Sequence, residues 1–164
     1  MVSINSLTSD EDFKTYQKMI EIGDGLSLNQ ICNITKLEPY IIQNWIKRGY
    51  VPHPVRKKYY LKHLSRILLI NALRECMVIE DIGFLMTYLN GNVDDESDDS
   101  ISEEELYGKF CNIVSSINDL NRIDETINKK VKDEELNICM KVMINAYVAG
   151  IITKKSHCYL QEIK

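Results

Sequence analysis

The sequence contains few of the patterns that mark secreted, membrane or metal-binding proteins. Its five cysteines are odd in number and none lies in a CxxC pair, so neither a metal clip nor a disulfide framework is indicated. No uninterrupted apolar run reaches the roughly 18 residues of a membrane span, and the first residues do not resemble a signal peptide. We expect a cytoplasmic protein with no membrane partner, whose cysteines are reduced and lie mostly in the core.

Catalytic patterns are equally scarce. His53, His63 and His157 have no serine, cysteine or carboxylate at an informative spacing, and no glycine-rich phosphate loop occurs. We predict that the chain is not an enzyme and has no catalytic residues, cofactor or metal. His63 is predicted to be a surface residue at the head of a helix.

Charge is sorted along the chain. The formal net charge is −4, yet residues 26–74 hold nine Lys or Arg and a single acid, Glu38. Residues 75–125 hold fourteen Asp or Glu against Lys109 and Arg122. A local excess of positive charge can attract phosphates even in an acidic protein. Double-stranded DNA is therefore the leading candidate partner.

Start and stop signals divide the first 49 residues into three short helices. Ser27 and Gln30 have the spacing of a capping box, in which each side chain bonds the backbone amide of the other residue. Pro39 suits the first turn of a helix, where its missing N–H is not needed. The second and third helices are joined by a tight turn, which indicates a helix-turn-helix. The predicted helices run from about Ser9 to Gly23, Ser27 to Thr35 and Pro39 to Gly49.

One side of the third predicted helix is suited to reading bases. The spacing of its polar residues places them opposite Ile42, Trp45 and Ile46, so they are expected to face outward. Gln and Asn can pair with adenine, and Lys can reach guanine or phosphate in the major groove. The alternative is an ordinary polar helix face. The outward residues are Tyr40, Gln43, Asn44 and Lys47.

Residues 50–60 are predicted to form a hairpin-like β wing. Two prolines exclude a helix, and the segment ends in three basic residues and two tyrosines. The basic residues would hold phosphates or enter the minor groove, whereas Tyr59 would either donate to a phosphate or pack under the wing. The basic residues are Arg56, Lys57 and Lys58.

The second half is predicted to be helical apart from an acidic loop. Helices are expected from Leu61 and from near Ile79. A stripe from Leu106 to Leu120 has coiled-coil-like spacing. A last helix after Asp133 is apolar on nearly every side, so it lies either at the centre of a bundle or under a second subunit. We therefore predict a homodimer formed through this region.

The acidic loop leaves three alternatives open. Its oxygen-bearing residues approach the spacing of a calcium loop, although Asp99 stands where the sharp turn needs Gly. The loop could instead screen the basic surface, or be a solvated linker. The residues with calcium-loop spacing are Asp94, Glu96, Asp98, Ser100, Ser102 and Glu105.

The order of these signals resembles a known DNA-binding domain. The stretch from Leu28 to Leu85 resembles the winged-helix domain of the MerR regulators, and the stretch from Tyr88 to Phe110, joined to it, resembles the bacterial domain-of-unknown-function family 1836. The MerR resemblance implies a winged helix that binds DNA, with Arg48 among the contacts. It is carried by Glu38-Pro39, Asn44-Trp45, Arg48-Gly49-Tyr50-Val51, Tyr59 and Leu64.

These observations predict a mainly α fold, consisting of a MerR-like winged helix-turn-helix with a small β wing and a helical C-terminal region. The predicted divisions are an N-terminal helix (1–25), the winged-helix domain (26–91), the acidic loop (92–104) and a region for dimerisation (105–164). The predicted function is DNA binding in transcriptional regulation, with an unknown effector ligand. The alternative is a protein-interaction adaptor on the same scaffold, favoured by Gln43 and Asn44 where MerR proteins usually have Arg and Tyr.

Overall fold

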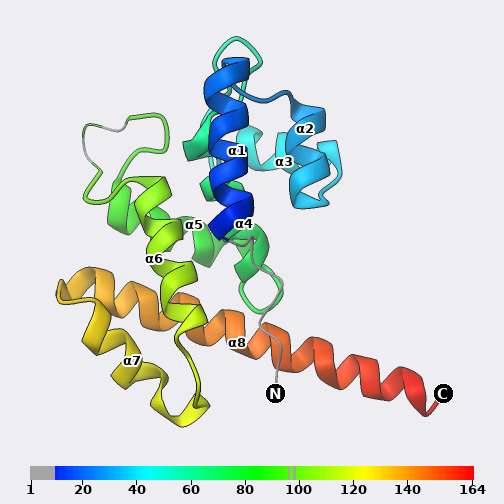
Figure 1. The fold of residues 1–164 in the computed structure, drawn as a ribbon, viewed down its shortest axis with the longest axis vertical. Coiled ribbons are helices and arrows are strands. Elements are labelled where there is room, and N and C mark those ends of the chain that lie inside the picture. Colours follow the sequence, from blue (N-terminus) through cyan, green and yellow to red (C-terminus); the bar gives the residue numbers. More distant parts are fainter. Residues whose placement is uncertain (1–9, 96, 98) are drawn as a thin grey trace.

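The computed structural model describes residues 10–95, 97 and 99–164, and over these residues the protein is mainly helical (Figure 1). The predicted mainly α class is therefore confirmed. The elements in chain order are α1 (Asp10–Gly23), α2 (Leu28–Thr35), α3 (Pro39–Lys47), α4 (Leu61–Leu73), α5 (Ile79–Asn90), α6 (Glu103–Ser115), the 3-10 turn η2 (Leu120–Arg122), α7 (Ile123–Lys130) and α8 (Glu134–Glu162).

Local capping signals set several of these boundaries. The capping box is formed as predicted: Gln30 N donates to Ser27 Oγ (3.3 Å), and Ser27 N donates to Gln30 Oε1 (2.8 Å). Pro39 is the first residue of α3. Asp133 caps α8 by accepting a hydrogen bond from the Leu136 amide at 2.8 Å. The predicted start of the first helix, Ser9, lies outside the described residues.

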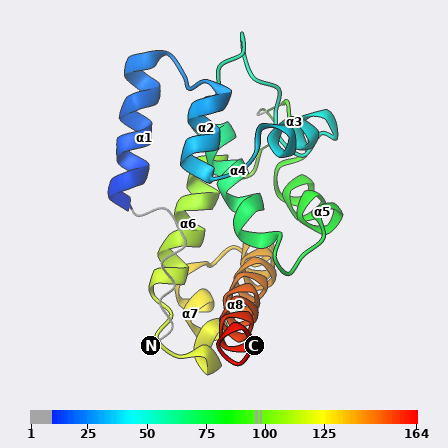
Figure 2. The ribbon, with the colours of Figure 1, turned by 90° about the vertical axis from the view of Figure 1, so that its right-hand side faces the viewer.

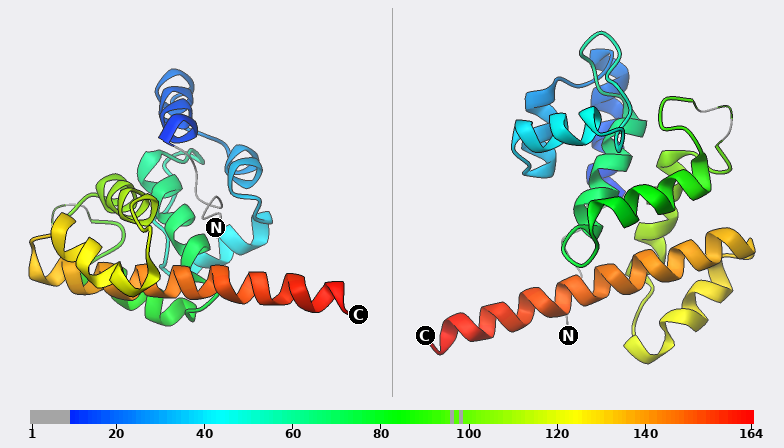
Figure 3. Two further views of the ribbon diagram at one scale, coloured as in Figure 1. Left: turned by 60° about the horizontal axis from the view of Figure 1, so that its bottom comes forward. Right: turned by 180° about the vertical axis from the view of Figure 1, so that it is seen from behind.

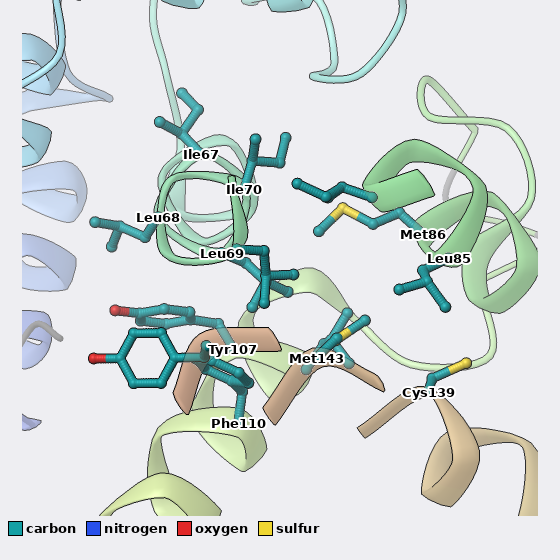
Figure 4. Packing of buried hydrophobic residues seen from close by; sticks show 14 of the residues in the cluster. Ile67, Leu68, Leu69, Ile70, Leu85, Met86, Tyr107, Phe110, Cys139 and Met143 are labelled. Carbon is teal, nitrogen blue, oxygen red and sulfur yellow. The ribbon is translucent and has the colours of Figure 1, made fainter. Parts of the chain in front are cut away.

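Helix α4 forms the centre of the protein. Its side chains point in several directions around its axis, Ile70 toward Met86 of α5 and Leu69 toward Tyr107 of α6 (Figure 4). Leu69 and Ile70 are buried, and α4 contacts α1, α2, α5, α6 and α8. Helices from the predicted winged-helix region and from the C-terminal region therefore share one apolar core, while α2 and α3 lie away from α7 and α8 (Figure 2).

The stripe from Leu106 to Leu120 does not form one helix or a free surface. Helix α6 ends at Ser115, and Leu120 lies in η2, where it is 48% exposed. Phe110 and Ile113 are buried inside the chain, and α6 packs against α4. The coiled-coil-like spacing therefore reflects an internal helix–helix contact, and the buried members of the stripe are already covered within the chain.

The expected β wing is a tight hairpin loop. No β-strand occurs among the described residues, and two isolated bridges take its place, Leu26 with Tyr59 and Val55 with Lys58. The segment between Val51 and Tyr60 is too short and too rich in proline to extend these bridges into paired strands. The predicted small β wing is therefore not shown among the described residues.

The expectation that the cysteines lie mostly in the core also needs correction. Of the five free cysteines only Cys139 is buried, where burial raises the pKa of its thiol, while Cys76 and Cys158 are exposed. Although no uninterrupted apolar run of about 18 residues occurs, an 18-residue window of α8 is apolar enough that α8 could cross a membrane by length and composition alone. Within the protein, 44% of that window is buried, and the core helix of a soluble protein passes the same test of length and composition.

Candidate nucleic-acid interface

Helix α3 has the two-sided character that its spacing predicts. Ile42, Trp45 and Ile46 are buried, and Ile42 is fully enclosed. Its polar residues Tyr40, Gln43, Asn44 and Lys47 are all exposed, with Tyr40 69% exposed. The predicted outward face is therefore confirmed as a solvent-facing surface, available to a partner.

The buried side of α3 is held by an aromatic anchor. Trp45 is 6% exposed, and the guanidinium of Arg74, just after α4, lies 5.9 Å from its ring centroid. A cation over an indole face is attracted by the ring quadrupole, in addition to the apolar area that the ring buries. This contact joins the back of α3 to the end of the central helix, so the outward face has a firm support.

Arg48, which the MerR resemblance assigns to DNA contact, already has partners within the chain. Its Nη2 donates to Glu80 Oε1 at 2.5 Å and to the Tyr50 hydroxyl at 3.1 Å. A backbone hydrogen bond, followed by the hydrogen bond from Arg48, lowers the pKa of Glu80, and the contact with Glu80 raises the pKa of Arg48. Tyr50 lies against Gly83 of α5, where any larger side chain would overlap its ring. Arg48 therefore fixes α3 against α5.

The tip of the hairpin loop exposes two basic side chains. Val55 and Lys58 exchange both backbone hydrogen bonds, N to O at 3.1 Å and 2.8 Å. Between them, Arg56 and Lys57 have positive φ angles of 51° and 64°, as a two-residue turn of this kind requires. Both side chains are exposed. We call residues 50–60 the wing loop; its tip rises at the end of the molecule opposite α8 (Figure 1).

The third predicted basic residue lies closer to the body of the protein. Lys58 is half-buried, and its Nζ is 3.4 Å from the carbonyl oxygen of Gly23. A Cβ on Gly25, whose φ is +91°, would come within 2.9 Å of the Lys58 Cβ, so only glycine fits this turn. Lys58 therefore helps to seat the wing loop on the turn after α1.

The base of the wing loop is held by a buried histidine. His63 is fully buried; its Nδ1 accepts from the Tyr60 amide at 2.9 Å, and its Nε2 contacts the His53 carbonyl at 3.1 Å. A neutral imidazole protonated on Nε2 satisfies both contacts. The prediction that His63 is a surface residue is therefore wrong. Its ring is buried because it provides the hydrogen-bond partners that paired strands would otherwise give to the Tyr60 amide and the His53 carbonyl.

Tyr59 packs under the wing loop. Its side chain is 4% exposed, its ring lies edge-on to that of His63 at 5.7 Å, and burial raises the pKa of its hydroxyl. Of the two roles open from the sequence, phosphate donor or support, the buried position selects support.

The acidic loop touches the wing loop at its base. Asp94 accepts from the His53 amide at 2.9 Å and lies 3.1 Å from its Nδ1, and the backbone hydrogen bond is the main reason why the pKa of Asp94 is lowered. Ser102, another residue with calcium-loop spacing, caps α6 by accepting from the Glu105 amide. Glu96 and Asp98 lie outside the described residues. In the described part of the chain no cluster of His, Cys, Asp or Glu has the arrangement of a metal site.

A buried ion pair closes the junction behind the wing loop. Arg66 pairs with Glu103, both nearly inaccessible, and its Nε donates to the Tyr50 carbonyl at 2.6 Å. Buried charges require such partners, since an isolated charge in the interior is strongly unfavourable. The start of α6 is thereby attached to α4 and to the exit of α3, a contact that no local sequence signal indicates.

The fold thus defines an all-helical protein over its described residues, with an exposed polar helix beside a basic loop. A family model for a domain of unknown function, DUF1836, matches residues 11–110, and the chain belongs to this family. The uncharacterized protein YkrK of Bacillus subtilis (strain 168) is 30% identical over 103 residues, which are 57% of this chain and 44% of that protein. The chain therefore spans less than half the length of this relative. No solved structure matches. These matches confirm the predicted family 1836 resemblance and give no support to the MerR resemblance.

Proposed function

We propose that this protein binds double-stranded DNA as a homodimer and acts as a transcriptional regulator in the bacterial cytoplasm. The observation that carries the proposal is the pairing of an exposed polar face on α3 with an exposed basic tip on the wing loop. In this MerR-like arrangement α3 enters the major groove, and the wing loop lies along the backbone.

Base readout belongs to the middle of α3. The exposed amides of Gln43 and Asn44 offer a donor and an acceptor in one plane, which matches the edge of adenine. Lys47 reaches guanine or phosphate one turn later, and Tyr40 stands near the start of the helix. The buried anchor Trp45 supports readout because it holds these side chains in a fixed orientation.

Backbone contacts belong to Arg56 and Lys57. Both side chains are exposed at the tip, and the wing loop is held by the buried His63 beneath it. Arg48 and Lys58 have partners within the chain, so we assign them to positioning rather than to direct phosphate contact. The proposed contact set is therefore Tyr40, Gln43, Asn44, Lys47, Arg56 and Lys57.

A dimer is proposed because one helix-turn-helix covers only a half-site. Two copies related by a two-fold axis would read an inverted repeat, with half-sites about one helical turn apart. Exposed apolar residues on α8, among them Ile138 and Ile152, support self-association through this helix.

The second candidate is a protein-interaction adaptor. Phe84 and Tyr88 of α5 are 68% and 52% exposed, and their ring centroids lie 6.3 Å apart. They form an aromatic surface of the kind that protein partners bury. The ion pair between Arg48 and Glu80 also favours this alternative, because it holds the charge of Arg48 within the chain. An adaptor would use α5 and would show no dependence on duplex DNA.

Selection from a random duplex library with the purified protein tests the proposal. We expect enrichment of one motif, as an inverted repeat. Failure to enrich any motif would favour the adaptor, provided that the parent binds a protein partner and that a Phe84→Ala and Tyr88→Ala double variant no longer binds it.

A further inference from the structure

Helix α8 extends beyond the body that covers it. Its first half packs against the rest of the chain through buried side chains that include Met140, Met143 and Tyr147. From Ile152 onward every residue is exposed, and the end of the helix projects past the other helices (Figure 3). The helix thus has a long side that faces solvent.

This side of α8 carries a regular stripe. Its members recur at alternating steps of four and three residues, the spacing of the contact positions in a coiled coil. At 1.5 Å per residue the helical part of the stripe, from Ile138 to Tyr159, is roughly 32 Å long. All its members are exposed, and the large apolar ones are 41% to 82% exposed. The stripe consists of Ile138, Val142, Asn145, Ala149, Ile152, Ser156 and Tyr159 of α8, and is continued by Ile163 directly after the helix.

The composition of the stripe fits another helix better than a lipid surface. It has two polar members, Asn145 and Ser156, and charged residues flank it, with Lys141 near one end and Glu162 near the other. A helix that lies on a membrane has a wide apolar face and a polar face rich in cations, whereas a helical partner needs only a narrow seam.

We propose that a second copy of this chain occupies the stripe, with the two α8 helices packed antiparallel across a two-fold axis at the level of Gly150. In this register the polar residues pair with each other, because Asn145 lies opposite Ser156 of the partner subunit. The apolar residues also pair with each other, because Ile138 faces the partner's Ile163 and Val142 faces the partner's Tyr159.

Size and charge select this orientation over a parallel one. The antiparallel register pairs small with large, Ala149 with the partner's Ile152, which gives layers of even thickness. A parallel register would pair each residue with itself, so Tyr159 would crowd Tyr159 of the partner subunit while Ala149 left a gap. The antiparallel register also sets Lys141 beside the partner's Glu162, twice in the dimer by symmetry, whereas the parallel register forms no such pair.

The inference deepens the proposed function by naming the interface of the proposed homodimer, but it is tested without DNA. Self-association of the full chain is measured by sedimentation equilibrium at tens of micromolar. We expect a dimer for the parent and a monomer for Ile152→Asp, whose side chain is exposed in the monomer. His157→Asp, also exposed but off the stripe, is the matched control and should stay dimeric.

Charge exchange and disulfide trapping test the register. Lys141→Glu or Glu162→Lys alone should weaken the dimer about tenfold, and the two changes together should restore it, because each pair becomes repulsive and then attractive again. In a Cys76→Ser, Cys158→Ser background, a mixture of Asn145→Cys and Ser156→Cys chains should form a disulfide dimer, and neither variant should do so alone. A cross-link in Asn145→Cys alone would overturn the antiparallel register. A monomeric parent, or vesicle binding in place of self-association, would overturn the inference while leaving DNA binding by the monomer unaffected.

Discussion

The guanidinium of Arg48, directly after α3, lies 2.5 Å from the carboxylate of Glu80 in the first turn of α5. This ion pair joins the outward-facing helix to a helix of the core. The charge that the sequence indicates for DNA is therefore held by an acid 32 positions further along the chain. If the protein binds DNA as proposed, Glu80 keeps the charge of Arg48 from reaching a phosphate.

Releasing Arg48 should strengthen DNA binding. In Glu80→Gln the side chain of Arg48 loses its counter-charge and can reach a phosphate, so affinity for any duplex should rise by about 1 kcal/mol or less at low salt. Fluorescence anisotropy measures this gain. Asp81→Asn, which removes the same charge at the neighbouring position, is the control, and an equal gain in both variants would show that only net charge matters.

Substitutions should distinguish the residues that read bases from those that contact the DNA backbone. Gln43→Ala or Asn44→Ala should cost about 1–3 kcal/mol on the selected motif and little on unrelated duplex. Arg56→Ala with Lys57→Ala should weaken all sequences alike and flatten the salt dependence by about 0.9 per lost phosphate contact. Lys154→Ala with Lys155→Ala removes the same charge from α8 and should leave the salt slope unchanged. Equal loss on both kinds of duplex for Gln43→Ala would contradict base readout.

Removing the buried histidine should destabilise the wing loop. In His63→Ala the Tyr60 amide and the His53 carbonyl lose their partners in a partly buried site and a buried ring is removed, so the free energy of unfolding should fall by about 2–4 kcal/mol. Urea denaturation measures the change. His157→Ala, at an exposed position, should stay within about 0.5 kcal/mol of the parent. A His63→Ala protein as stable as the parent would show that the wing loop does not depend on this ring.

If the acidic loop screens the wing loop, removing its charge should give DNA access to the basic tip. Neutralising Asp94, Asp95 and Asp99 to Asn should tighten non-specific DNA binding, most visibly at low salt. DNA binding equal to that of the parent would indicate a solvated linker, and a calcium-dependent rise in melting temperature that Glu105→Gln abolishes would indicate a cation loop.

The contact between Asp94 and His53 should make stability depend on pH. Because the folded pKa of Asp94 is lowered, the stabilisation from this contact is present above the ordinary Asp pKa, about 3.9, and is lost as pH falls through the lowered value.

Local patterns predict much of the fold because their partners lie close in sequence. Ser27 and Gln30 are three positions apart, and the outward face of α3 follows from helical spacing alone. Burial of His63 depends on the His53 carbonyl and on packing under the wing loop, which no periodicity encodes. The contact between Asp94 and His53 spans 41 positions.

The spacing of an apolar stripe likewise does not predict which surface covers it. The stripe from Leu106 and the stripe on α8 have the same four-and-three spacing, yet α6 is covered by α4, whereas the seam on α8 faces solvent. Only the tertiary arrangement separates an internal contact from a surface that a second chain could cover.

The most direct test of DNA binding is an anisotropy titration of the selected duplex between about 50 and 200 mM salt. The proposed contacts predict a linear fall of log affinity with log salt, with a slope of about −4 to −6 for roughly five or six phosphate contacts in the dimer. No salt-dependent binding to any duplex at low ionic strength would contradict the proposed function and leave the adaptor in its place.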